Sequence, residues 1–165
     1  KMRNNNKTQI IAEEGKQELL IIREFDLKRD KVFEAFSNPE MLEKFYAPFG
    51  NKMVFNHHNY KTGGSYSWCN IDQQGNILCT FNGVIHEIEP PVRIIHTSEF
   101  MELPERGHVV MEAMLFEELP NNRTKLTIHD VCFSIEDRDA MIKSGMESGL
   151  IEIFKQLDNL FKEDL

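Results

Sequence analysis

The side chains in this sequence suited to metal binding or catalysis are histidines, cysteines and a few paired carboxylates. A zinc site requires three or four converging ligands, and the sequence holds no His-x-His or His-x-x-x-His pair. We therefore expect separate surface or edge histidines and no bound metal or cofactor. The pairing to check is His86 with His96, which flank Pro90-Pro91 and would face each other across a hairpin. The six histidines are His57, His58, His86, His96, His108 and His129.

The three cysteines, Cys69, Cys79 and Cys132, show no pattern typical of a reactive or structural site. An odd number without Cys-x-x-Cys spacing argues against a disulfide framework or a zinc knuckle, and free thiols are typical of a reducing compartment. A nucleophile needs an adjacent base and an orienting group, but no such motif and no Gly-x-Ser-x-Gly elbow is present. We predict inert, buried or half-buried thiols and a protein that is not an enzyme.

Paired carboxylates lie near the ends of predicted strands. Glu87 and Glu89 form one pair, and Glu117 and Glu118 form another. We interpret both pairs as solvated, because charged side chains are seldom buried without a partner. Glu87 is also placed to pair with Arg93 across a turn.

Aromatic and methionine side chains are the more informative group. They occur in the predicted short helices, the strands and the last helix, and they would line a common space if the sheet curved around that helix. The space is either a filled core or a cavity whose methionines adapt to varied shapes, and the residue types favour neither. The set comprises Phe45, Tyr46, Phe49, Trp68, Phe81, Phe100, Phe116 and Phe154, with Met111, Met114, Met141 and Met146.

The charge balance excludes several kinds of partner. The chain of 165 residues carries 19 basic and 27 acidic side chains, for a formal charge of −8. This sign repels phosphate, so nucleic acids and anionic membrane surfaces are disfavoured. No apolar run reaches the roughly 18 residues of a membrane span, and no signal-peptide core follows the basic start. We expect a cytoplasmic protein without membrane insertion.

A single domain fits this length, and residues 18–165 contain its regular elements. Residues 1–17 are polar and are expected to form a loose tail. Residues 19–27 resemble a strand, and Asp30 resembles the N-cap of a short helix with an apolar stripe. Asn38-Pro39 ends that helix and begins a second one, Glu40 to Phe45.

The middle of the chain alternates between strand-like segments and turn signals such as Gly63-Gly64, Pro90-Pro91 and Pro120-Asn121-Asn122. Short strands at this spacing predict an antiparallel meander. Together with the first strand they give a sheet of about six or seven strands. The predicted strands are residues 52–59, 65–71, 77–88, 92–101, 108–118 and 125–133.

The C-terminal segment is predicted to be helical. Ser134-x-x-Asp137 resembles a capping box for a helix over residues 135–143. A longer helix follows, with an apolar stripe at spacings of three and four that requires a large apolar surface to pack on. Since the sheet is the surface available, five side chains should face it: Met146, Leu150, Ile153, Leu157 and Leu160.

This order of elements resembles the helix-grip fold of the START and birch-pollen-allergen superfamily. Within it, several segments are similar to bacterial relatives of the activator of the heat shock protein 90 ATPase. The similar segments are Arg23-Glu24-Phe25-Asp26, Val32-Phe33-Glu34-Ala35-Phe36, Asn38-Pro39-Glu40, Gly63-Gly64-Ser65-Tyr66, Phe81-Asn82-Gly83-Val84, Pro90-Pro91-Val92-Arg93-Ile94, Glu136-Asp137-Arg138-Asp139-Ala140-Met141 and Ser144-Gly145-Met146.

The resemblance implies an α+β protein in which a curved antiparallel sheet surrounds a long C-terminal helix, with two short helices after the first strand. Phe45-Tyr46-Ala47-Pro48 replaces a Trp-Trp-x-Pro-like stretch of the family, and Gly149-Leu150 replaces a frequent Gly-Trp. Both changes keep apolar bulk, so they alter the shape of a pocket more than the fold.

Three functions follow as hypotheses. The first is a binding domain that holds a small apolar or amphipathic ligand between the sheet and the last helix, with Tyr66 or Thr97 orienting it. The second is an interaction protein that regulates the chaperone ATPase in a stress response. The third is an enzyme like the polyketide cyclases of the superfamily, which requires titratable groups inside the cavity. The predicted ligand-binding residues are Phe45, Tyr46, Phe49, Tyr66, Trp68, Phe81, Thr97, Phe100, Met114, Met146, Leu150 and Phe154.

Overall fold

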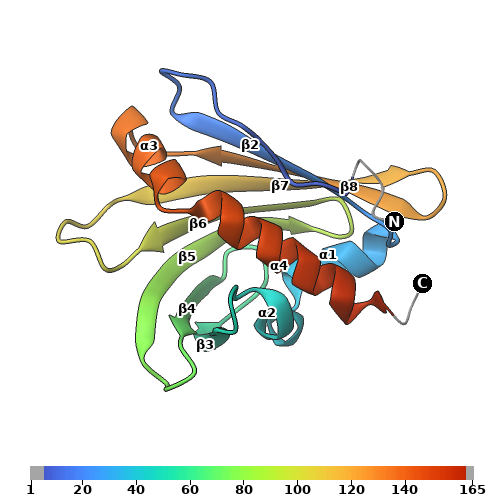
Figure 1. The fold of residues 1–165 in the computed structure, drawn as a ribbon, viewed down its shortest axis with the longest axis horizontal. Coiled ribbons are helices and arrows are strands. Elements are labelled where there is room, and N and C mark those ends of the chain that lie inside the picture. Colours follow the sequence, from blue (N-terminus) through green and yellow to red (C-terminus); the bar gives the residue numbers. More distant parts are fainter. Residues whose placement is uncertain (1–5, 163–165) are drawn as a thin grey trace.

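The computed structural model describes residues 6–162 and shows one antiparallel sheet that curves around a long helix (Figure 1). The strands are β1 (Gln9–Ile11), β2 (Glu18–Phe25), β3 (Lys52–His58), β4 (Ser65–Ile71), β5 (Ile77–Glu89), β6 (Arg93–Phe100), β7 (Val109–Leu119) and β8 (Arg123–Val131). The helices are α1 (Arg29–Ser37), α2 (Pro39–Phe45), α3 (Ile135–Lys143) and α4 (Met146–Leu160). The sheet order is β1-β2-β8-β7-β6-β5-β4-β3.

This architecture confirms the predicted α+β helix-grip fold. All six strands predicted between residues 52 and 133 are present, with ends within two residues of the predicted ones. The eighth strand is β1, which lies in the segment expected to be a loose tail and pairs with β2. A strand of three residues is too short to show the alternation of apolar and polar side chains by which strands are recognised in a sequence.

Strand β2 shows how alternation builds the inner face of the sheet. Leu19, Ile21 and Phe25 are buried on one side, and Arg23 shares that side. The Arg23 guanidinium donates hydrogen bonds to both carboxylate oxygens of Asp158 on α4. Because a buried cation requires a partner, this pair fixes the C-terminal half of α4 against the sheet.

The two short helices begin differently from each other. The N-cap of α1 is Lys28 and not Asp30 as predicted; Asp30 lies in the first turn. An acidic residue is favoured there too, since it faces the positive end of the helix dipole, so the two positions look alike in sequence. The N-cap of α2 is Asn38, whose side chain accepts a hydrogen bond from the Glu40 N–H at 3.0 Å.

The C-terminal helices follow the predicted boundaries. Ser134 caps α3 by accepting a hydrogen bond from the Asp137 N–H, and Gly145 separates α3 from α4 with φ of 88°. Ile153 and Leu157 are buried against the sheet as predicted, but Leu160 is 39% exposed. In the last turn Phe161 packs on the core instead, because it lies four residues from Leu157 and continues the buried side.

The core is densest where α1, α2 and the second half of α4 meet the sheet. Aromatic rings there meet edge to face, as in Phe25 with Phe154, whose centroids are 5.7 Å apart, and Phe36 with Phe45, at 5.4 Å. Such pairs add about 0.5–1.5 kcal/mol each beyond the area that they bury. Within residues 6–162, no helix combines the length and apolar character needed to cross a membrane.

Candidate functional site

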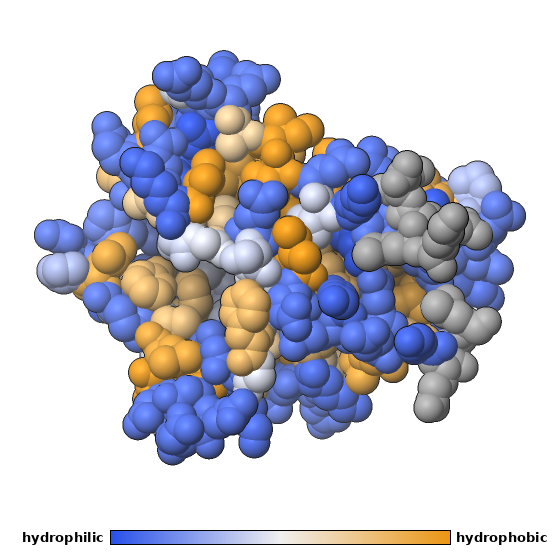
Figure 2. All heavy atoms as spheres, viewed as in Figure 1, coloured by the Kyte–Doolittle hydropathy of each residue, from blue (hydrophilic) through white to orange (hydrophobic). Residues whose placement is uncertain are grey.

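A cavity of about 550 Å³ lies between the inner face of the sheet and the helices α3 and α4. Figure 2 shows hydrophobic side chains gathered around a hollow beside the first turns of α4. Its wall is formed by strands β3 to β8, by α1, α2 and the residues that follow α2, and by α3 and α4. This volume falls within the range of sites for small molecules.

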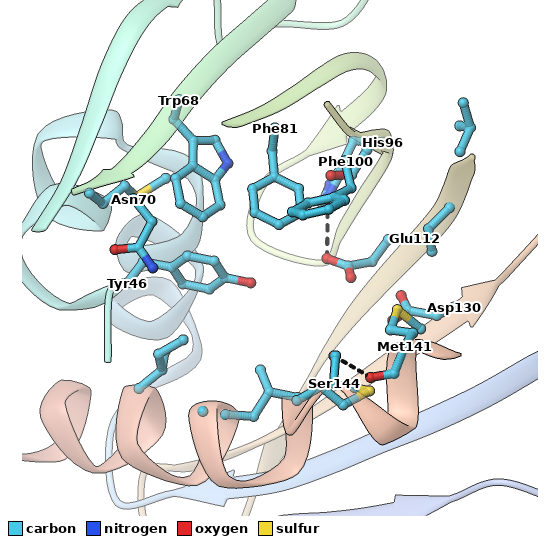
Figure 3. A pocket seen from close by; sticks show the side chains of 18 of the residues that line it. Tyr46, Trp68, Asn70, Phe81, His96, Phe100, Glu112, Asp130, Met141 and Ser144 are labelled. Atoms are coloured by element: carbon cyan, nitrogen blue, oxygen red, sulfur yellow. Dashed lines mark hydrogen bonds and ion pairs between the residues drawn. The ribbon is translucent and has the colours of Figure 1, made fainter. Parts of the chain in front are cut away.

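One side of the cavity is an aromatic row. Trp68, Phe81 and Phe100 are direct cross-strand neighbours on β4, β5 and β6. The Trp68 and Phe81 rings stack at 4.8 Å, and Phe81 and Phe100 lie 5.5 Å apart. Tyr46 meets Trp68 edge to face at 6.0 Å, and its hydroxyl points into the cavity (Figure 3). The row offers apolar ring surface to a ligand.

A second row is polar and titratable. His96, Glu112 and Asp130 are direct cross-strand neighbours on β6, β7 and β8, and all three line the cavity (Figure 3). The His96 Nε2 atom lies 3.2 Å from Glu112 Oε1. His96 and Phe100 are four residues apart on β6, so the two rows lie on the same face, about 13 Å apart along the strand. We call these three residues the polar row.

The two carboxyl groups of the polar row differ in their affinity for protons. Burial, and then the charge of Glu112, raise the pKa of Asp130 well above its usual value. Burial opposes ionisation of Glu112 as well, but hydrogen bonds from His96 and Asp130 keep the pKa of Glu112 below its usual value. Two adjacent carboxyl groups in a poorly solvated site retain one proton between them. Of the two, Asp130 is therefore the group that holds this proton, and Glu112 is the group that ionises first.

Tyrosines surround the polar row with neutral hydroxyls. Burial raises the pKa of Tyr46, Tyr60 and Tyr66, so these phenols keep their protons at neutral pH. The Tyr66 hydroxyl donates to the Thr97 carbonyl at 2.8 Å, and its ring lies 5.8 Å from that of His96. Gly83 leaves the space for this ring, because a Cβ there would lie 2.3 Å from the Tyr66 hydroxyl.

At the rim, His108 and Asp137 form a second acid–base pair. The His108 Nδ1 atom lies 3.0 Å from both carboxylate oxygens of Asp137, and this hydrogen bond raises the pKa of His108. Nearby, burial raises the pKa of the Cys132 thiol to about 11. The Cys132 thiol is therefore protonated and a weak nucleophile at neutral pH.

Eight of the twelve residues predicted to bind a ligand line the cavity: Tyr46, Tyr66, Trp68, Phe81, Phe100, Met114, Met146 and Leu150. Two others, Phe45 and Phe154, are wholly buried in the filled core. Phe45 therefore does not line the space as predicted, whereas Tyr46 and Trp68 do.

The remaining two predicted residues point elsewhere. Phe49 is 63% exposed, in a left-handed turn that leads its side chain away from the core. On β6 the inward side chains are those of His96 and Ser98, so the intervening Thr97 points to the outer face. Only the Thr97 carbonyl acts at the site, as the acceptor for Tyr66.

The polar row was not predicted, although its members carry a signal. Glu112 occupies the alternation position of Met114, and Asp130 that of Ile128. A charged residue at an inward position is the sequence sign of a buried polar site. The suggested pairing of His86 with His96 does not form, because a bulge places Ile85 opposite His96, but the predicted pair of Arg93 with Glu87 forms at 2.8 Å.

The arrangement of the donor side chains bears on metal binding. Among residues 6–162, no group of three or more His, Cys, Asp or Glu side chains is arranged to hold a metal ion. The polar row is extended along a ladder, with its three side chains on successive strands. Such a row suits proton exchange and hydrogen bonding to a ligand better than tetrahedral coordination.

The curved sheet, the long helix that it surrounds and the cavity between them define a helix-grip protein. Solved structures share this fold. A protein from Rhodobacter sphaeroides has a TM-score of 0.83 at 20% identity, covering 95% of this chain and 99% of its own. A Mycobacterium smegmatis protein has a TM-score of 0.82 at 18% identity, covering 96% of this chain and 99% of its own. An AHSA1 protein from Silicibacter pomeroyi has a TM-score of 0.71 at 16% identity, covering 90% of this chain and 99% of its own.

The sequence profile of the family described as Activator of Hsp90 ATPase homolog 1-like protein matches residues 26–162. The chain belongs to this family. The match begins directly after β2 and includes every strand that lines the cavity and all four helices. No curated protein matches the chain.

Proposed function

We propose that this protein binds a small apolar or amphipathic molecule in the cavity between the sheet and α4. The observation that carries the proposal is the cavity of about 550 Å³ with an aromatic row on one wall. Apolar surface removed from water contributes about 25 cal/mol per Å², so the aromatic row supplies most of the affinity. The polar row then orients the ligand, as the few polar groups of small-molecule sites do.

Native mass spectrometry of the purified protein with a library of lipids and aromatic compounds tests this proposal. We expect a one-to-one adduct and a change in the fluorescence of Trp68, the single tryptophan of the chain. Ser98→Leu, which narrows the cavity, should weaken or abolish the adduct. Thr97→Leu is the matched control, because the neighbouring side chain points to the outer face. The absence of any adduct and any change in Trp68 fluorescence would contradict ligand binding.

The polar row favours a second candidate function, acid–base catalysis on a bound carbonyl compound. Glu112 is the stronger acid of the pair, so its carboxylate can accept a proton from carbon, while the Asp130 carboxyl group can donate one to oxygen. Groups whose environments drive their pKa values apart are the usual acid–base partners. Such chemistry corresponds to the polyketide-cyclase hypothesis. The titratable groups that meet in the cavity favour this hypothesis over that of a chaperone regulator.

Hydrogen exchange on a simple ketone tests the catalytic candidate. With 4-phenyl-2-butanone in deuterated buffer, a catalyst accelerates exchange next to the carbonyl above the buffer rate. Glu112→Gln should remove the acceleration, and Glu117→Gln, on the same strand but exposed, should not. Exchange at the buffer rate would argue for binding alone.

The description of the family supports the remaining hypothesis, a regulator of the heat shock protein 90 ATPase. A pull-down with that chaperone, combined with an ATPase assay, tests it. Regulation predicts both binding at micromolar concentration and a changed rate of ATP hydrolysis. Binding without any change in rate would not support a regulator.

A further inference from the structure

The ionisable groups that line the cavity are biased toward negative charge. Glu112, Asp130 and Asp137 line it, together with His96 and His108. Among the lining residues of the described chain there is no lysine and no arginine. A carboxylic acid or a phosphate would meet no permanent positive charge there, and Glu112 would repel it. The cavity therefore disfavours anionic ligands.

Asp130 has an incomplete set of hydrogen bonds. The residue is buried, with a relative exposure of 3%. Its Oδ1 atom has no hydrogen-bond partner within residues 6–162, although about 90% of buried polar groups have one. The residue lines the cavity and lies opposite Glu112 on the neighbouring strand (Figure 3). An unpaired carboxyl oxygen at a cavity wall marks a place for a hydrogen-bond donor of a ligand.

Aromatic rings complete the surroundings of this carboxyl pair. Tyr46 is close enough that Glu112 and Asp130 both affect its proton affinity, and Tyr66 packs on His96. Ring faces attract cations within about 6 Å of their centroids. Carboxyl groups framed by aromatic rings form the arrangement that recognises ammonium groups in proteins, while the apolar row, about 13 Å away along β6, accommodates an apolar body.

We infer that the ligand of this cavity is an amphipathic amine, with its apolar body on the aromatic row and its cationic nitrogen between Glu112 and Asp130. This inference rests on the proposed function, since it specifies the ligand of the same cavity. In the empty protein the shared proton neutralises part of the charge of the two carboxyl groups. A bound ammonium group takes over that role, so Asp130 releases its proton to solvent.

Proton release gives the inference a pH signature. The titratable groups that face the pair from the surrounding elements are Tyr46, Tyr60, Tyr66, His96 and Cys132. Asp137 and Arg138 act on the Cys132 thiol beside it. The tyrosines and the thiol stay neutral near pH 7, so the proton that leaves comes from the carboxyl pair. Because binding releases a proton, amine affinity should rise with pH as long as the amine itself stays protonated.

Isothermal titration of the full chain with three matched probes tests the inference. The probes are 4-phenylbutylamine, 4-phenylbutanol and 4-phenylbutyrate, which share one body and differ in the charge of the head group. Homologues with two and six methylene groups allow for the length of the cavity. We expect the amine to bind about tenfold or more tightly than the alcohol, and the acid to bind more weakly than both. Amine titrations in two buffers of different ionisation enthalpy should show net release of protons.

Substitutions locate the head group. Glu112→Gln and Asp130→Asn should each lower amine affinity about tenfold and lower alcohol affinity by less, because an amide still hydrogen-bonds a hydroxyl but carries no charge. Glu117→Gln, an exposed carboxylate on the same strand as Glu112, should change neither. Thermal unfolding of each variant verifies that it is folded. The proton-release measurement uses the unaltered chain, so it tests the inference even if a variant fails to fold.

Two results would overturn the inference. Equal or tighter binding of the alcohol or the acid would remove the amine preference while leaving the proposed function intact. Binding of the broader library but of no phenylalkylamine at about 1 mM would do the same. If neither the library nor the probes bind, the proposed function itself fails, and the inference fails with it.

Discussion

The interior has a filled half and a hollow half, although aromatic residues dominate both. In the filled half, rings meet edge to face around Phe36, which contacts Phe45 and Phe154. In the hollow half, Trp68, Phe81 and Phe100 form a row along the strands and leave space above it. The residue types are therefore similar, and what differs is the element that covers them.

Helix coverage explains the difference. Helix α1 packs on β7 and β8, and α2 packs on α4, so side chains from three helices fill that half. Over the hollow half lie α3 and the first turns of α4, and Gly149 on α4 contributes no side chain. A row of aromatic residues thus becomes part of a core or the wall of a cavity, according to the bulk of the side chains opposite it.

The same truncation at two positions of α4 should separate the halves most clearly. Leu157 is wholly buried in the filled half, and Leu150 lines the cavity. We expect Leu157→Ala to lower the free energy of unfolding by about 2–5 kcal/mol, because it opens a void in packed core. Leu150→Ala should cost about 1 kcal/mol, because space already adjoins it. Chemical denaturation measures both, and equal losses would contradict the division into two halves.

Added bulk should produce the next largest effect. Ala35 is wholly buried on α1, so Ala35→Leu overpacks the filled half and should cost about 1–3 kcal/mol. Ser98→Leu places similar bulk at the cavity wall and should change stability by less than about 1 kcal/mol. A severe loss of stability in Ser98→Leu, measured by thermal unfolding, would mean that the hollow half tolerates no additional volume.

The polar row makes the stability of the hollow half depend on pH. Because the pKa of Asp130 is raised in the folded state, the folded chain binds more protons than the unfolded chain above about pH 4, and stability falls as pH rises from there. Asp130→Asn removes this loss and should raise stability at pH 7, by about 1.4 kcal/mol for each unit of raised pKa. Melting temperatures of both proteins at pH 4 and pH 7 measure the effect, and the gain should shrink at pH 4.

The smallest expected effect concerns one hydrogen bond at the cavity wall. Tyr66→Phe removes the hydroxyl that donates to the Thr97 carbonyl and should cost about 0.5–1.5 kcal/mol. Thr124→Val is its counterpart in the filled half, where the wholly buried Thr124 hydroxyl donates to the Leu27 carbonyl at 2.7 Å. We expect this second change to cost more, about 1–3 kcal/mol, because no water reaches the orphaned carbonyl. Urea denaturation of both variants decides the order.

The sequence predicted the fold well because strand alternation and helix stripes are local patterns. Turn residues located every strand from β3 to β8, and the capping residue Ser134 located the start of α3. The exceptions also have local causes. Strand β1 is too short to show alternation, and Leu160 fits the spacing of the stripe yet lies beside the buried direction of α4.

The candidate site was only partly predictable, because its decisive feature is not local. His96, Glu112 and Asp130 lie far apart in the chain. They meet through the register of three strands. A shift of one residue in either pairing would separate them. Phe154 lies in the core and Phe81 lines the cavity because of how the helices pack. The type of residue, which is the same at both positions, does not reveal this difference.

The register of the polar row also bears on how relatives of this protein diversify. Its three positions lie on the inner strands of the sheet, with two further strands beyond β8 and three beyond β6. The strands on both sides keep these positions in register, so substitutions at positions 96, 112 and 130 can change the polarity of the cavity wall while the sheet is kept. On the proposed function, ligand preference is thus a trait that can vary among relatives without a change of fold.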